Sequence, residues 1–220
     1  MNRLILLSVL PLALAGPAIA SADGPSDDFM GEAVTFFDNW PAMPFLAELD
    51  VQCPGGEVEW LNAFTPVCTR SGRLRVRDLP LYTCVSGLDA HGDPDPRLQG
   101  VGSYELNVNW DELYAGEVWS EWTIALSSDC DPAALQDPQV YWRGNSTGKR
   151  MVAAYDASGM PIAWVGELMV VGKGHGGEIE GLHIKGTEMF FTVTPLPLPR
   201  DVTHGDPTTP EGIFTGVVFE

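Results

Sequence analysis

The feature that most constrains the fold is a strict alternation of apolar and polar residues in two neighbouring segments. Between residues 104 and 110 every second side chain is apolar or aromatic, namely Tyr104, Leu106, Val108 and Trp110. A β-strand with one buried face has this period of two, because successive side chains point to opposite faces of the sheet. The pattern recurs in residues 118–126, so we expect consecutive half-buried strands.

Further apolar segments, separated by turn residues, extend this pattern along the chain. We expect strands near residues 57–66, 71–85, 100–110, 117–127, 139–145, 150–156, 162–172 and 178–194, and a further strand at 212–219. Between them, sequences such as GNSTG (144–148) and GKGHGG (172–177) predict turns. Residues 31–50 contain two prolines among aromatic residues, so we expect a short helix or irregular cover there.

Strands joined by short turns pair antiparallel. The expected fold is therefore all-β, an antiparallel closed β-barrel of about eight strands, with a β-sandwich as the alternative. Closure is favoured because it removes exposed edge strands. Eight strands leave an interior that side chains fill or that holds one small ligand.

The N-terminal residues resemble a secretory signal peptide. Arg3 precedes an apolar run at 4–15, and small residues follow at positions 18, 20 and 22. The run is shorter than a bilayer span requires, and no stop-transfer sequence follows, which argues against the alternative of a membrane anchor. We divide the chain into a signal peptide (1–22), an acidic and aromatic lead (23–50) and a single β-barrel domain (51–220), and expect a secreted or periplasmic protein.

All four cysteines lie in the part expected to be exported, where disulfides are stable. Four cysteines permit three connectivities. Loop closure favours pairs of cysteines that are near in sequence, which are Cys53–Cys68 and Cys84–Cys130. A zinc site is the alternative, but the sequence has no CxxC motif and no histidine within a few residues of a cysteine.

The charge balance excludes one class of partner. Twelve Lys and Arg against 30 Asp and Glu give a formal net charge of −18, which would repel the polyanionic backbone of a nucleic acid. Four cations nevertheless cluster at Arg70, Arg73, Arg75 and Arg77. They could bind an anion, although pairing with acidic residues on neighbouring strands is the simpler interpretation.

Residues 141–191 carry a glycine-rich order, W-x-G, a turn, an apolar strand, and then G-x-G-x-G-G-x-x-E-G-L. This order resembles that of secreted barrel proteins of the allene oxide cyclase and dirigent-like type, and the likeness covers about half of the chain. It implies an antiparallel barrel with an apolar cavity, which in some relatives steers a reactive small molecule. No catalytic residue of the family can be placed on this chain. The matching residues are Trp142, Gly144, Gly172, Gly174, Gly176, Gly177, Glu180, Gly181 and Leu182.

Several side chains are candidates for binding or chemistry. Four tryptophans in expected strands could line an apolar pocket, with core filling as the alternative: Trp110, Trp122, Trp142 and Trp164. If the protein is an enzyme, the candidate catalytic groups are Tyr104, Glu105 and Asn107. Asp89, Asp93 and Asp95 offer oxygen ligands for calcium, but their spacing is not that of an EF-hand. The four histidines are not spaced as metal ligands, and Asn145-Ser146-Thr147 is a formal glycosylation acceptor.

These observations predict an exported β-barrel that binds a small hydrophobic or aromatic molecule, with no cofactor and no membrane span. One alternative is a cofactor-free cyclase or isomerase of the allene oxide cyclase-like type. Another is a non-catalytic acidic surface protein that contacts calcium. The sequence leaves open whether the protein is an enzyme and whether it forms a homo-oligomer.

Overall fold

A computed structural model describes residues 31–39, 50–54, 56–62, 65–69, 73–192 and 212–220. The expected signal peptide at 1–22 lies outside the described residues, as do Arg70 and His204. Within the described residues the regular structure is strands and two short 3₁₀ helices. No helix among them is long and apolar enough to cross a membrane.

Eleven strands follow one another along the described chain. The first four are short: β1 (Glu32–Asn39), β2 (Asp50–Gln52), β3 (Val58–Asn62) and β4 (Thr65–Cys68). Five long strands come next: β5 (Leu74–Leu88), β6 (Pro94–Trp110), β7 (Gly116–Leu126), β8 (Tyr141–Tyr155) and β9 (Pro161–His175). The last two are β10 (His183–Thr192) and β11 (Gly212–Phe219), and the 3₁₀ helices are η2 (Pro132–Leu135) and η3 (Gly177–Ile179).

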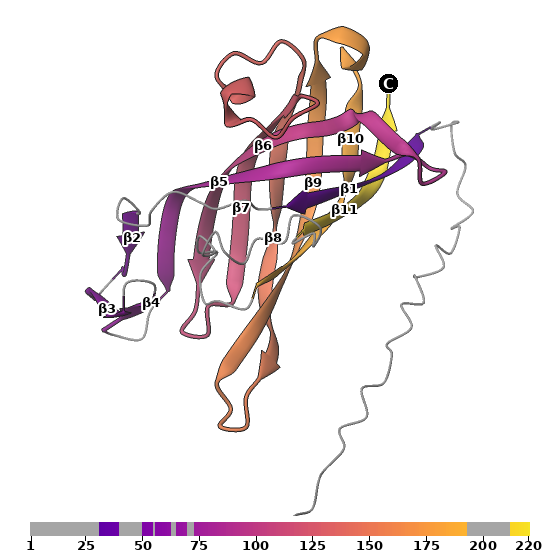
Figure 1. The fold of residues 1–220 in the computed structure, drawn as a ribbon. Coiled ribbons are helices and arrows are strands. Elements are labelled where there is room, and N and C mark those ends of the chain that lie inside the picture. The colour runs from indigo at the N-terminus through magenta and orange to yellow at the C-terminus, as the bar shows by residue number, and fades with distance from the viewer. Residues whose placement is uncertain (1–30, 40–49, 55, 63–64, 70–72, 193–211) are drawn as a thin grey trace, which may run out of the picture.

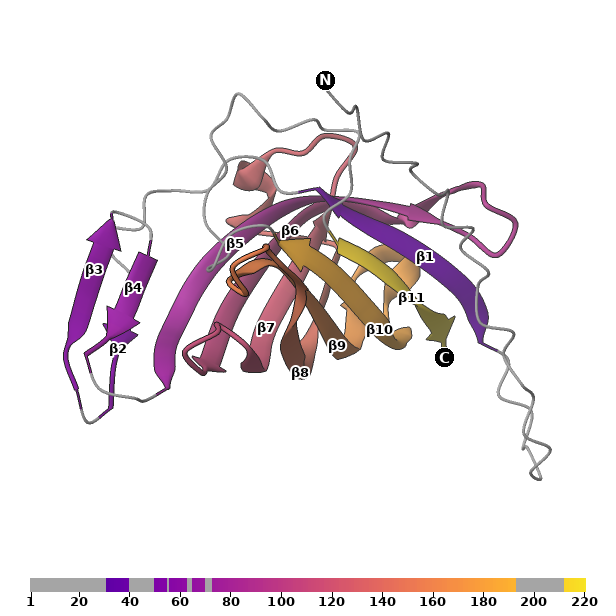
Figure 2. The same ribbon diagram turned by 90° about the horizontal axis from the view of Figure 1, so that it is seen from below.

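Eight of these strands form a closed ring (Figures 1 and 2). Strands β5 to β11 pair in sequence order, and β1 closes the ring because it pairs with β11 on one side and β5 on the other. Every pairing is antiparallel. The expected all-β fold and the closure of about eight antiparallel strands are thus confirmed. The short strand β2 pairs with β5 beside the ring, and β3 and β4 form a separate hairpin.

The expectation of a helix or irregular cover at 31–50 is wrong for residues 32–39, which form strand β1. Val34 and Phe36 are buried, whereas Ala33 and Thr35 are more exposed, so this segment has the same period of two as the other strands. Phe36 stacks on Phe214 of β11 with ring centroids 4.3 Å apart. The acidic and aromatic lead therefore supplies the strand that closes the ring.

The two expected turns at 144–148 and 172–177 are also corrected. Residues 144–148 lie inside the single strand β8, where two strands were expected, and β9 continues to His175. Gly144 and Gly172 face the ring interior beneath the indole of Trp122. A Cβ atom at Gly172 would lie 2.4 Å from Cη2 of Trp122. These glycines are needed for close packing inside a strand pair and not for a change of direction.

Two disulfides fasten outlying segments, one of them directly to the ring, and their pairing is the one that loop closure favours. Cys53–Cys68 joins the segment after β2 to the end of β4. Cys84–Cys130 ties the connection between β7 and β8 to β5. No described cysteine is free.

Candidate functional site

The alternation along each strand determines which side chains enter the ring. In β6 to β10 the even-numbered residues point inward, and most of them are apolar and buried. A small pocket of about 20 Å³ lies among them. It is lined by Leu81, Tyr104, Leu106, Ser120, Leu168, Glu188 and Phe190. Space of this size holds about one water molecule.

Glu188 is the polar group that distinguishes this pocket. It projects inward from β10 and is only 5% exposed, with Leu168 beside it on β9 and Phe214 beside it on β11. A carboxyl group is rarely buried among apolar side chains, because its burial is costly unless it is hydrogen-bonded, so such a residue is a candidate for a functional group. The sequence analysis did not single out Glu188. The signal was available, because Glu188 is in phase with the apolar residues Ile184 and Phe190.

Two hydroxyl groups accompany Glu188 on the far side of the ring. Ser120 of β7 lines the pocket, and its Oγ forms a buried hydrogen bond of 2.6 Å with Oγ of Ser146 on β8. Tyr104 of β6 lines the same pocket and is 8% exposed. The pocket is therefore apolar with a few polar groups that converge on it. This is the composition of a small-molecule site, although the volume is far below that of one.

The three catalytic candidates from the sequence do not share one face of their strand. Tyr104 points inward, whereas Glu105 is exposed on the outer face of β6. Asn107 also lies outside, where its Oδ1 accepts a hydrogen bond from the backbone N–H of Asp78 at 3.4 Å. Of the three, only Tyr104 can contact a molecule inside the ring.

The four candidate tryptophans are all buried, and none of them lines the small pocket. Trp122 covers Gly144 and Gly172, as described above. Trp142 donates a 2.7 Å hydrogen bond from Nε1 to the carbonyl oxygen of Arg97, and Trp164 donates one of the same length to that of Leu113. These indoles thus pack and anchor the ends of the ring.

A buried arginine occupies the end of the ring near the β6–β7 turn. The guanidinium carbon of Arg150 lies 4.5 Å from the ring of Trp110 and 4.8 Å from that of Trp164. Arg150 is 1% exposed and donates hydrogen bonds to Oγ1 of Thr192 and the carbonyl oxygen of Tyr114. Burial lowers the pKa of Arg150 to about 9 and raises that of the Tyr114 hydroxyl. The two flanking indoles oppose the loss of charge, because their π faces attract a cation.

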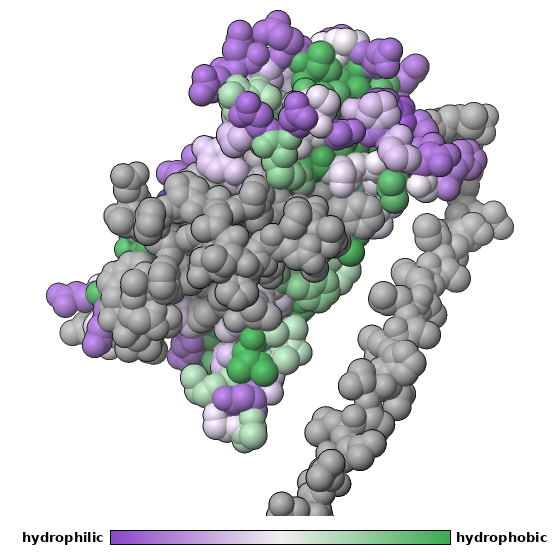
Figure 3. All heavy atoms as spheres, in the orientation of Figure 1, coloured by the Kyte–Doolittle hydropathy of each residue, from purple (hydrophilic) through white to green (hydrophobic). Residues whose placement is uncertain are grey.

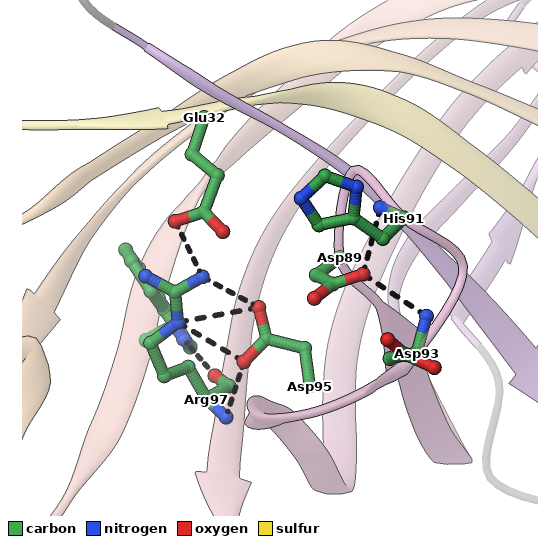
Figure 4. A network of polar contacts seen from close by, with 7 residues as sticks. Glu32, Asp89, His91, Asp93, Asp95 and Arg97 are labelled. Atoms are coloured by element: carbon green, nitrogen blue, oxygen red, sulfur yellow. Dashed lines mark hydrogen bonds and ion pairs between the residues drawn. The ribbon is translucent and has the colours of Figure 1, made fainter.

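A second polar network lies near the opposite end of the ring (Figure 4). Arg97 contacts both Asp95 and Glu32, with Nη2 at 2.7 Å from Asp95 Oδ2 and 2.8 Å from Glu32 Oε2. The hydrogen bonds that Arg97 donates to Asp95 raise the pKa of Arg97. Because Glu32 belongs to β1 and the other two residues to β6, the network fastens the closing strand.

The calcium candidates do not converge. Asp95 faces Arg97, whereas Asp89 accepts hydrogen bonds from the backbone N–H groups of His91 and Asp93 at 2.8 and 2.9 Å (Figure 4). These hydrogen bonds lower the pKa of Asp89, and the bond from Asp93 has the largest effect. Within the described part of the chain, no group of three or more His, Cys, Asp and Glu side chains is placed to hold a metal ion.

The described members of the arginine row and the described histidines of the strands lie on the outside of the ring. The guanidinium of Arg77 stacks on Trp119 at 4.5 Å and donates to the carbonyl oxygen of Val108 at 3.3 Å. Arg73 borders an open outer groove of about 220 Å³, together with Asp111, Glu117 and Lys149. His175 stacks on Tyr141, and His183 stacks on Phe219. None of these side chains lines the pocket beside Glu188.

Comparisons of this chain with protein-family models, with curated proteins and with solved structures found no match.

Proposed function

We propose that the chain is an exported protein that binds a small hydrophobic or aromatic molecule inside its ring of strands, beside Glu188. The observation that carries this proposal is a buried carboxyl group in an otherwise largely apolar pocket. The two disulfides and the likeness to barrel proteins of the allene oxide cyclase type are in keeping with it. We also propose that the ring of strands is a closed barrel of the calycin-like type.

The chemistry of the pocket narrows the ligand class. Leucine and phenylalanine side chains favour an apolar body, whereas Glu188 and Tyr104 favour one hydroxyl or amine group on it. The pocket of about 20 Å³ is smaller than such a molecule, so the guest enters as side-chain ends such as those of Leu81 and Phe190 move aside. The cost of that movement reduces the apparent affinity, and a bound guest raises the melting temperature.

The test compares two variants with the same chemical change. Glu188→Gln alters the carboxyl group inside the ring, and Glu105→Gln alters an exposed one on the outer face. Ligands retained by protein purified from its own host are identified by native mass spectrometry and titrated by tryptophan fluorescence. We expect Glu188→Gln to weaken binding about tenfold or more and Glu105→Gln to leave it unchanged. The proposal would be contradicted if the purified protein retained no ligand and its tryptophan fluorescence did not change on addition of any hydrophobic or aromatic compound.

A cofactor-free cyclase or isomerase is the second function that one observation favours. Tyr104 and Glu188 line the same pocket from different strands, so a proton donor and a proton acceptor face one space. Such an enzyme would act by holding its substrate in a reactive shape and by moving one proton. Tyr104→Phe should then abolish conversion of the retained compound and leave its binding within about threefold. Equal loss of binding and conversion would instead leave Tyr104 with a binding role alone.

A further inference from the structure

The cations of this acidic protein are unevenly placed. Its three lysines, Lys149, Lys173 and Lys185, all lie on the outward face of three adjacent strands, β8, β9 and β10, and all are exposed. Arg143 of β8 lies on the same face beside Lys173. Among the outward-facing residues of these strands, the one acid is Glu167. We call this surface the outer wall, and its formal charge is positive although that of the chain is −18.

Exposed apolar side chains lie between these cations. Met169, Val171, Met189 and Phe191 are 43–54% exposed. The strand register places Val171 directly beside Lys185, and Met189 directly beside Glu167. Single exposed apolar residues are common on proteins, but a group spread over adjacent strands marks an interaction surface.

The combination of cations and apolar side chains indicates the kind of partner. Lysine side chains lie along an apolar surface with their ammonium groups at its polar boundary, and anionic headgroups attract them. Shallow burial of Met and Phe side chains adds affinity for a bilayer surface. A two-fold contact between copies of this wall would instead place lysines against lysines on two chains of charge −18.

We propose that the outer wall of β8, β9 and β10 binds the surface of an anionic lipid bilayer, so that the protein lies on a membrane without spanning it. This surface is on the outside of the ring, and the proposal does not depend on a ligand inside it. The outer face of the next strand, β7, carries Glu117 and Glu121, and Glu121 Oε2 lies 3.8 Å from Nη2 of Arg143, so the wall has an acidic border on that side.

Vesicle co-sedimentation of the chain without residues 1–22 tests the proposal. The protein should bind vesicles made of equal parts phosphatidylglycerol and phosphatidylcholine, should not bind pure phosphatidylcholine, and should dissociate as salt is added. Lys185→Gln should weaken binding about fivefold, and Lys173→Gln combined with Lys185→Gln about 25-fold. The matched control is Arg73→Gln, which removes one exposed cation immediately before β5. Arg73 borders the outer groove that Lys149 also lines, but it lies outside β8, β9 and β10 and three strands away from β8. This control should leave binding unchanged.

Apolar substitutions separate lipid contact from simple charge attraction. Phe191→Ser should weaken binding, whereas Met160→Ser should not, although Met160 is 63% exposed at the end of the β8–β9 hairpin. Figure 3 shows hydrophobic residues exposed on this projecting end. Failure to bind anionic vesicles at low salt overturns the proposal, as does equal weakening by Lys185→Gln and Arg73→Gln. Capture of an acidic host protein without vesicle binding would assign the wall to a protein partner and also overturn it.

Discussion

Arg150 and Trp110 form the contact that fills the ring near the β6–β7 turn, with the guanidinium carbon 4.5 Å from the indole. The ring of Trp164 lies 4.8 Å from the same guanidinium carbon. Because Arg150 is 1% exposed, its flat side chain serves as packing as well as charge. One end of the ring is thus filled by a guanidinium group and two indole rings that contact it.

Removal of this side chain should destabilise the fold. Arg150→Ala leaves a cavity between two indoles and removes two cation–π contacts, so we expect a loss of about 3 kcal/mol in the free energy of unfolding. Arg150→Met fills most of the space without a buried charge and should cost less than half as much. Urea unfolding followed by tryptophan fluorescence measures both. Equal losses in the two variants would show that packing is not the main contribution.

The lowered pKa of Arg150 predicts a dependence on pH. Burial holds the pKa at about 9 in the folded protein, below its usual value in the unfolded chain. Above pH 9 the unfolded state therefore binds more protons at this site than the folded state, and stability rises with pH. The free energy of unfolding of the wild type minus that of Arg150→Met should be constant below pH 9 and should increase from pH 9 to 11. A flat difference would mean that the indoles keep Arg150 charged.

The network that fastens β1 predicts unequal effects for the two acids bound to Arg97. The side chain of Asp95 is 3% exposed, whereas that of Glu32 is 45% exposed. Asp95→Asn removes the buried partner and should cost about 2 kcal/mol, since Arg97 itself is partly solvated. Glu32→Gln breaks an exposed ion pair and should cost less than about 1 kcal/mol. Chemical denaturation at low and high salt checks both values, and a larger loss in Glu32→Gln would contradict the assignment.

The strands could be predicted because the period of two is a local property of the sequence. The prediction missed β1 although residues 32–39 alternate, because the prolines at positions 41 and 44, just after them, favoured an irregular segment. The sequence also misleads at glycines, since glycine is found both in turns and in strands at places of close approach. Gly172 can be distinguished from a turn residue only when Trp122, fifty positions away, is known to lie above it.

The residues of the candidate site were harder to predict from the sequence than the strands were, because their positions depend on which face of each strand points inward and on how the strands pair. Alternation already implies that Tyr104 and Glu105 face opposite sides of their strand, so one of them had to lie outside the ring. The same rule would have selected Glu188, a polar residue in phase with apolar neighbours. The placement of Arg150 between Trp110 and Trp164 depends on the register of four strands and on closure of the ring, which no local pattern specifies.

The packing of Trp122 on Gly172 gives the sharpest test of the ring interior. Gly172→Ala would bring a Cβ atom to 2.4 Å from Cη2 of Trp122, which is 3% exposed and cannot easily move. We expect a loss of about 2–3 kcal/mol in the free energy of unfolding. In the Trp122→Phe background the atoms that clash are absent, so the same substitution should cost less than half as much. Thermal and urea unfolding of the four proteins in this cycle measure the coupling. If Gly172→Ala costs the same in both backgrounds, the loss comes from strand backbone strain, and the indole is not what requires glycine at this position.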